Sequence, residues 1–100
     1  MIPNLPIPAI QALCKQHRVR ELMLFGSAAR GDFDAAVSDF DFLVEFIDPS
    51  KRDLFDHFDL QDALEGLLKR KVDLVSKRAL KTWVRDQVLA ETKPVYYAGA

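Results

Sequence analysis

The chain has 100 residues, of which 49% are hydrophobic, and its 14 Lys and Arg residues nearly balance its 15 Asp and Glu residues. This composition is typical of a soluble globular protein, and the length predicts one domain over residues 1–100. A net charge of −1 argues against broad, sequence-independent nucleic-acid binding, which needs many cations on phosphates, so we expect no stable nucleic-acid partner.

The chain shows no sign of secretion or of membrane insertion. Its single cysteine, Cys14, excludes an internal disulfide and a zinc cluster built from cysteines. The N-terminus lacks a basic segment followed by an apolar stretch, and no run approaches the roughly 20 apolar residues of a membrane span. We therefore expect a cytoplasmic protein.

The first predicted element is an amphipathic helix, because residues recur on one face at the spacing i, i+3, i+4, i+7: Ile10, Leu13, Cys14 and His17. A strand over residues 21–25 follows and ends at Gly26. Ser27 is placed to cap a short helix over residues 28–30. Residues 32–38 are polar or small enough to form a loop.

Period-2 alternation predicts the next strand, with one set of side chains toward the core: Phe40, Phe42, Val44 and Phe46. A helix that opens near Lys51 should bury one stripe of apolar residues: Phe55, Phe58, Leu60, Leu64, Leu67 and Leu68. A third strand over residues 71–75, a last helix over residues 80–88 and a short strand over residues 95–97 complete one α/β unit.

Two carboxylates open the second strand. Asp39 and Asp41 are two residues apart, so both side chains leave the same face of the strand, roughly 6–7 Å apart. Oxygen ligands at that spacing suit Mg²⁺, and two such ions can activate an attacking oxygen and stabilise a leaving one. The pair therefore predicts a magnesium site.

Asp73 is the natural third acidic residue. It lies between Val72 and Leu74 in an apolar strand, where burying an unpaired carboxylate would be costly. On a strand next to that of Asp39 and Asp41, it would complete a metal-binding trio. It could also accept the proton of an attacking hydroxyl.

The turn after the first strand suits the phosphates that accompany such a metal. Gly26 lets the backbone approach a phosphate, and Ser27 can donate a hydroxyl hydrogen bond at the start of the following helix. Arg30 can bridge phosphate oxygens with its planar guanidinium. Ser38 either braces Asp39 or contacts phosphate, and one of three later cations could also contact phosphate: Lys77, Arg78 or Lys81.

Each feature alone has an ordinary explanation. A Gly-Ser pair is common in strand-to-helix turns, and acidic residues often end strands. The occurrence of the Gly-Ser turn, the Asp39–Asp41 pair and Asp73 in this order in one chain favours a nucleoside triphosphate site. We interpret His17 and His57 as structural or surface residues, because this phosphate chemistry needs no histidine.

Together these residues resemble the motifs of the DNA polymerase β-type nucleotidyltransferase superfamily, over residues 22–75 and again near residues 89–96: Gly26-Ser27-x-x-Arg30-Gly31, Ser38-Asp39-x-Asp41 and Asp73. Length and motif order resemble its minimal nucleotidyltransferase (MNT) proteins. The resemblance implies an α+β fold with a small mixed sheet and helices packed mainly on one face. It implies ATP and two Mg²⁺ ions as substrate and cofactors. It also implies that Gly26 and Ser27 bind the triphosphate and that the three aspartates bind the metals.

The resemblance further implies a partner. Many MNT proteins are antitoxins encoded beside a HEPN-domain ribonuclease toxin, and some transfer AMP from ATP to a tyrosine of that toxin. We therefore expect a hetero-oligomer with a HEPN protein and release of pyrophosphate. Two alternatives stay open: an antitoxin that acts by binding alone, and a nucleotidyltransferase for a small molecule.

Overall fold

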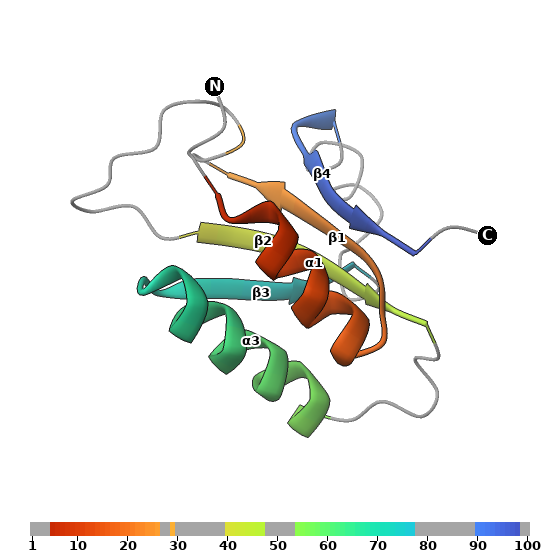
Figure 1. The fold of residues 1–100 in the computed structure, drawn as a ribbon. Helices are drawn as coiled ribbons and strands as arrows, with labels where there is room; N and C mark the ends of the chain where they lie inside the picture. Colours follow the sequence, from red (N-terminus) through yellow and green to blue (C-terminus); the bar gives the residue numbers. More distant parts are fainter. Residues whose placement is uncertain (1–4, 27–28, 30–39, 48–53, 78–89, 99–100) are drawn as a thin grey trace.

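The computed structural model describes residues 5–26, 29, 40–47, 54–77 and 90–98. The elements in chain order are α1 (Ile7–Gln16), β1 (Val19–Phe25), β2 (Phe40–Phe46), α3 (Leu54–Leu68), β3 (Val72–Ser76) and β4 (Lys93–Tyr97), as Figure 1 shows. The predicted elements in these ranges are therefore confirmed, with ends that differ by a few residues. The predicted loop over residues 32–38 and the predicted helix over residues 80–88 lie outside the described residues.

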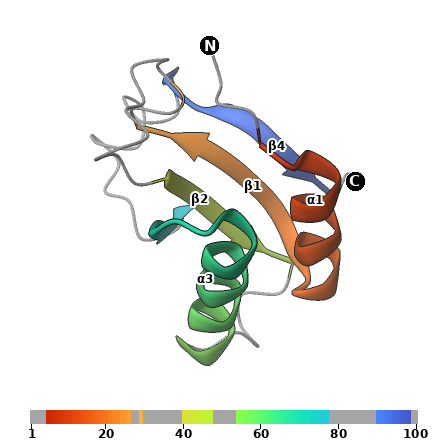
Figure 2. The same cartoon turned by 60° about the vertical axis from the view of Figure 1, so that its left-hand side comes forward.

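The strands form one mixed sheet in the order β3-β2-β1-β4. β1 pairs antiparallel with β2 and with β4, whereas β2 pairs parallel with β3. α1 and α3 contact each other and lie together on one face of this sheet, as the two ribbon views show (Figures 1 and 2). The prediction of a small mixed sheet with helices packed mainly on one face is confirmed.

The core lies between that face of the sheet and the two helices. β2 contributes the four side chains that its alternation predicted, all of them buried: Phe40, Phe42, Val44 and Phe46. The neighbouring strands and the helices complete the cluster with Leu22, Leu24, Val72, Leu74, Ile10, Cys14, Leu60 and Leu64. Fully burying one such large apolar side chain contributes about 1.5–3 kcal/mol, so this layer is the main source of stability.

Phe58 corrects the predicted stripe of α3. Its side chain is 52% exposed, whereas Leu60 and Leu64 are fully buried. Two positions along a helix turn the side chain by about 200°, so Phe58 faces away from the core when Leu60 faces it. The Phe58 ring instead makes an edge contact with the ring of His57, with 5.8 Å between centroids. The side chain of Phe55 lies outside the described residues.

A residue with left-handed backbone follows each of α1 and α3. Arg18 follows α1 with φ 57°, and Lys69 follows α3 with φ 55°. The backbone N–H of Lys69 donates to the carbonyl of Glu65 at 2.8 Å, which closes the last turn of α3. These tight ends let each helix lead within a few residues into the strand that follows it. No helix in the described part of the chain is long and apolar enough to cross a membrane.

Cys14 yields a prediction about thiol chemistry. Its burial raises the pKa of the thiol from 9.0 to about 12, because the thiolate would lose its hydration. We expect iodoacetamide to alkylate Cys14 slowly at mildly alkaline pH in the folded protein and rapidly once urea unfolds it. The folded state holds this proton more tightly, so the group's contribution to stability is complete below pH 9.0 and is lost as the pH rises toward about 12. Equal alkylation rates in the folded and unfolded protein would contradict the assignment.

Candidate functional site

Three predicted site segments meet at one end of the sheet. Gly26 follows the C-terminal end of β1, and Asp41 lies near the N-terminal end of β2, which runs antiparallel to it. Asp73 lies near the N-terminal end of β3, which runs parallel to β2. The pairing register places Phe25 opposite Asp41 and Asp41 opposite Asp73, so one row across three strands contains both carboxylates.

Both carboxylates project from the face opposite the helices. Their strand neighbours Phe42 and Leu74 belong to the helix-covered core, and successive side chains of a strand point to opposite faces. Neighbouring strands lie about 4.8 Å apart, so two aspartates in register can share one cation. Asp41 is half-buried and Asp73 is exposed.

The exposure of Asp73 corrects one part of the sequence argument. The apolar residues on either side of it, Val72 and Leu74, face the helices, whereas Asp73 faces away from them. The strand therefore does not force the carboxylate into an apolar environment. What points to a function for Asp73 is its position opposite Asp41 on the neighbouring strand, and not a burial penalty.

The turn after β1 brings the backbone of Gly26 against the side chain of Asp41. Gly26 has φ +74°, a conformation that L side chains rarely adopt. A Cβ atom at this position would lie 3.2 Å from Cγ of Asp41 and closer still to Oδ2. The structure therefore requires glycine here for two reasons, the backbone conformation and the space that the Asp41 carboxylate occupies.

The start of the predicted short helix is consistent with this turn. The backbone N–H of Ala29 donates to the carbonyl of Gly26 at 3.1 Å, and the side chain of Ala29 is buried. The other predicted ligands in this region lie outside the described residues: Ser27, Arg30, Ser38 and Asp39. Their roles remain predictions, as does the complete trio of carboxylates.

The described donors fit a hard divalent cation. Asp41 and Asp73 offer carboxylate oxygens from adjacent strands, and Mg²⁺ typically takes one or two protein carboxylates and completes its shell with phosphate oxygens and water. No group of three or more His, Cys, Asp or Glu side chains within the described ranges is arranged to hold a metal. A site built from this pair would thus depend on Asp39, on substrate oxygens or on both.

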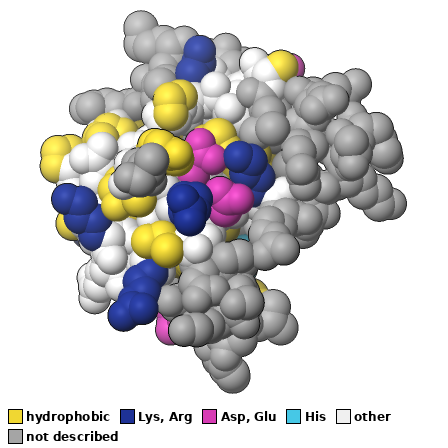
Figure 3. Space-filling view, turned by 90° about the vertical axis from the view of Figure 1, so that its right-hand side faces the viewer, with side chains coloured by type: hydrophobic (Ala, Val, Ile, Leu, Met, Phe, Trp, Pro, Cys, Tyr) yellow, Lys and Arg dark blue, Asp and Glu magenta, His cyan; other side chains and the backbone are white. Residues whose placement is uncertain are grey.

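Lys77 lies at the other end of β3. Its Nζ atom forms an ion pair with Oε1 of Glu21, at 3.0 Å, and Glu21 lies in β1 far from the Gly26 turn. Lys77 therefore does not lie near the Gly26 turn, and Arg78 and Lys81 lie outside the described residues. In the described part of the face in Figure 3, basic and acidic side chains likewise lie next to one another among hydrophobic ones.

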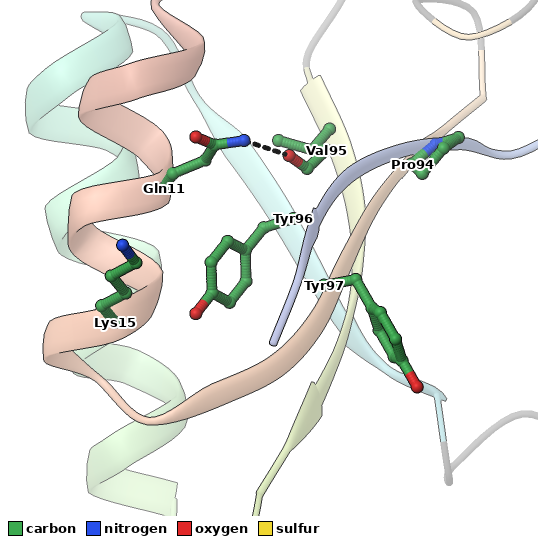
Figure 4. Close-up of a pocket in the computed structure, with 6 residues that line it drawn as sticks. All are labelled: Gln11, Lys15, Pro94, Val95, Tyr96 and Tyr97. Atoms are coloured by element: carbon green, nitrogen blue, oxygen red, sulfur yellow. Dashed lines mark hydrogen bonds between the residues drawn. The ribbon is translucent and has the colours of Figure 1, made fainter. Parts of the chain in front are cut away.

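A separate cavity of about 360 Å³ lies between α1 and β4 (Figure 4). It is lined by Gln11, Lys15, Pro94, Val95, Tyr96 and Tyr97. The Tyr96 side chain points toward α1, whereas that of Tyr97 points away from it, and the side-chain amide of Gln11 donates to the carbonyl of Val95 at 3.3 Å. β4 and β3 are opposite edges of the sheet, so this cavity is remote from Asp73 and contains none of the predicted site residues.

Comparison with known proteins agrees with this arrangement. The model of the nucleotidyltransferase domain family matches residues 9–96. The protein adenylyltransferase MntA of Thermococcus cleftensis is 43% identical over 74 residues, which cover 73% of this chain and 71% of that protein. A solved structure provisionally assigned as a minimal nucleotidyltransferase shares 44% identity at a TM-score of 0.77, and the match covers 88% of this chain and 87% of that one.

A second structural neighbour contains a nucleotide analogue. The crystal structure of a toxin–antitoxin with AMP-PNP includes a chain that is 27% identical to this one at a TM-score of 0.77, covering 94% of this chain and 75% of that one. The family match spans β1, β2 and β3 in full and β4 up to Tyr96, and the site residues on β2 and β3 lie within it. The chain therefore belongs to the nucleotidyltransferase domain family, as its Gly-Ser and Asp-x-Asp motifs indicated.

Proposed function

We propose that this chain is an antitoxin that transfers AMP from ATP to a tyrosine hydroxyl of a partner HEPN ribonuclease toxin. The observation that carries the proposal is the row in which Asp41 and Asp73 lie opposite each other beside the turn at Gly26. Similarity to a protein named as an adenylyltransferase and to a toxin–antitoxin structure supports the choice of acceptor class.

The reaction would join the tyrosine oxygen to the α-phosphorus of ATP. The bond from that phosphorus to the oxygen that bridges to the β-phosphate breaks, and pyrophosphate leaves with both electrons of that bond. Asp73, whose carboxylate is exposed, would accept the hydroxyl proton as the new bond forms. Holding the two reactants in line would provide much of the acceleration.

The other residues of the site would bind and orient the nucleotide. Gly26 and Ser27 would approach the triphosphate through backbone amides and a hydroxyl, and Arg30 and Ser38 would add side-chain contacts to phosphate. Asp39, Asp41 and Asp73 would hold Mg²⁺, in two ions on our proposal. When bound, the metal supplies charge neutralisation on the triphosphate and the leaving pyrophosphate.

The proposed setting is a cytoplasmic hetero-oligomer of this chain with the HEPN protein. An antitoxin that neutralises its partner only by binding is the main alternative, and it is supported by a chain of this fold in the crystal structure of a toxin–antitoxin. The two functions differ in whether neutralisation requires the aspartates.

Intact-mass spectrometry of the partner separates these functions. After incubation of the HEPN protein with this chain, ATP and Mg²⁺, we expect its mass to rise by one or more AMP units. Asp41→Asn and Asp73→Asn should each abolish the increase, because each removes a carboxylate from the paired row. The control is Asp62→Asn, which makes the same chemical change at an exposed position of α3. An unmodified partner in a tight complex would favour the binding-only antitoxin.

Gly26→Ala tests the contact between the turn and Asp41. The new Cβ would overlap the Asp41 carboxylate, so the carboxylate or the turn must move, and a displacement near 1 Å can cost on the order of 10²-fold in rate. We expect AMP transfer to fall by about that factor while the circular dichroism spectrum stays that of the folded parent.

Gly66→Ala is the matched control for Gly26→Ala. Gly66 lies on the exposed side of α3, and an added Cβ there would meet no atom within 4 Å apart from its own neighbours and the backbone of its helix. Alanine is also the better helix former by roughly 0.5–1 kcal/mol, so this variant should keep full transfer and gain stability. Equal transfer rates in the two variants would show that the site tolerates displacement of Asp41.

A further inference from the structure

Among the described residues, side chains of α3 and no further strand meet the outer edge of β3. β3 is an edge strand of the sheet. The carbonyl of Lys71 accepts a hydrogen bond from the backbone N–H of Phe40 at 3.2 Å, so the peptide groups of Lys71 and Asp73 face β2. Because this direction alternates along a strand, the peptide groups of Val72 and Leu74 face outward.

Two hydrogen bonds from α3 satisfy two of these outward groups, the N–H of Val72 and the C=O of Leu74. The backbone N–H of Val72 donates to Oε2 of Glu65 at 2.9 Å. Nε2 of His57 donates to the carbonyl oxygen of Leu74 at 2.8 Å. Both bonds are partly buried, which shields them from competing water. Asp73 therefore lies between two residues whose backbone is tied to the helix.

The position of the β3 backbone determines where the Asp73 carboxylate lies relative to Asp41. Its side chain is exposed, and no hydrogen bond or ion pair to it occurs within the described part of the chain. The distance between the Asp73 and Asp41 carboxylates therefore depends on the position of the β3 backbone relative to β2. On one side, β3 is held by its parallel pairing with β2, and on the other side by the hydrogen bonds to Glu65 and His57.

We propose that Glu65 and His57 are positioning residues, which hold β3 so that Asp73 stays in register and at cation-sharing distance from Asp41. This inference rests on the proposed function, because it concerns the same two carboxylates. It gives His57 a role through the backbone of β3 and none in the chemistry, which agrees with its interpretation from sequence as a structural residue.

Paired substitutions separate the hydrogen bonds from the size of the side chains. Glu65→Ala removes the acceptor for Val72, whereas Glu65→Gln keeps a side-chain oxygen that can accept the same bond. His57→Leu removes the donor to Leu74, whereas His57→Gln keeps an N–H. Asp62→Ala is the control, since it removes an exposed carboxylate from the same helix.

The first measurement is the affinity for Mn²⁺ in the presence of AMP-PNP, followed by electron paramagnetic resonance. Loss of groups that orient metal ligands typically costs 10–100-fold in affinity or activity. Because Glu65 and His57 act through the backbone, we expect about tenfold weaker Mn²⁺ binding in Glu65→Ala and His57→Leu, and values within about twofold of the parent in the glutamine variants and the control.

The second measurement is AMP transfer to the HEPN protein, made well below the melting temperature of every variant. A displaced Asp73 should lower kcat by about tenfold and leave KM for ATP within about twofold. A purely structural role would lower the melting temperature alone, and parent-like Mn²⁺ affinity and kcat in folded Glu65→Ala and His57→Leu would overturn the inference.

The Asp73→Asn variant distinguishes failure of the positioning role from failure of the proposed function. If Asp73→Asn loses Mn²⁺ affinity and transfer while the α3 variants keep both, only the positioning role is wrong. If the parent chain binds no Mn²⁺ with AMP-PNP and transfers no AMP, the proposed function and the positioning role fall together.

Discussion

The parallel contact between β2 and β3 is the constraint on which the rest of the site depends. β2 runs antiparallel to β1, so the C-terminal end of β1 and the N-terminal end of β2 meet at one end of the sheet. Because β3 pairs parallel with β2, the N-terminal end of β3 lies at that same end, and Asp73 lies opposite Asp41. If β3 paired antiparallel with β2, the N-terminal end of β3 would lie beside the C-terminal end of β2, and the two carboxylates would lie about one strand length apart.

At this end of the sheet, strand alternation places apolar side chains and carboxylates on opposite faces. On the helix-covered face, Phe42 and Leu74 bury apolar surface, and the adjacent residues Asp41 and Asp73 face the other way. A register shift of one residue would exchange the two sets and drive carboxylates into the core, so the same apolar packing that stabilises the sheet also specifies where the acids lie. Gly26 adds a local condition, since its missing side chain leaves the space that the Asp41 carboxylate occupies.

Both edge strands of the described sheet, β3 and β4, have features that limit pairing with another chain. At β3, Glu65 and His57 satisfy two outward backbone groups, the N–H of Val72 and the C=O of Leu74, which would otherwise be available for pairing with another chain. At β4, Pro94 lacks a backbone donor, the register shifts between Leu22 and Met23, and Gln11 donates to the carbonyl of Val95. Both edges thus disfavour association through strand addition. At β3, the hydrogen bonds from Glu65 and His57 have two effects: they occupy outward backbone groups, and they hold the strand that carries Asp73.

The amino-acid sequence by itself determined the order of the described elements, the buried face of β2 and the presence of glycine and aspartate motifs typical of a nucleotidyltransferase, because periodicity and short motifs are local properties. Only the tertiary structure decided that Asp73 is exposed, that Phe58 faces away from the core and that the Asp41 side chain packs on Gly26. It also decided that Glu65 and His57 reach the backbone of β3. These features depend on how strands pair and on how α3 docks against the sheet, and residues far apart in the chain set that geometry together, so no local pattern contains it.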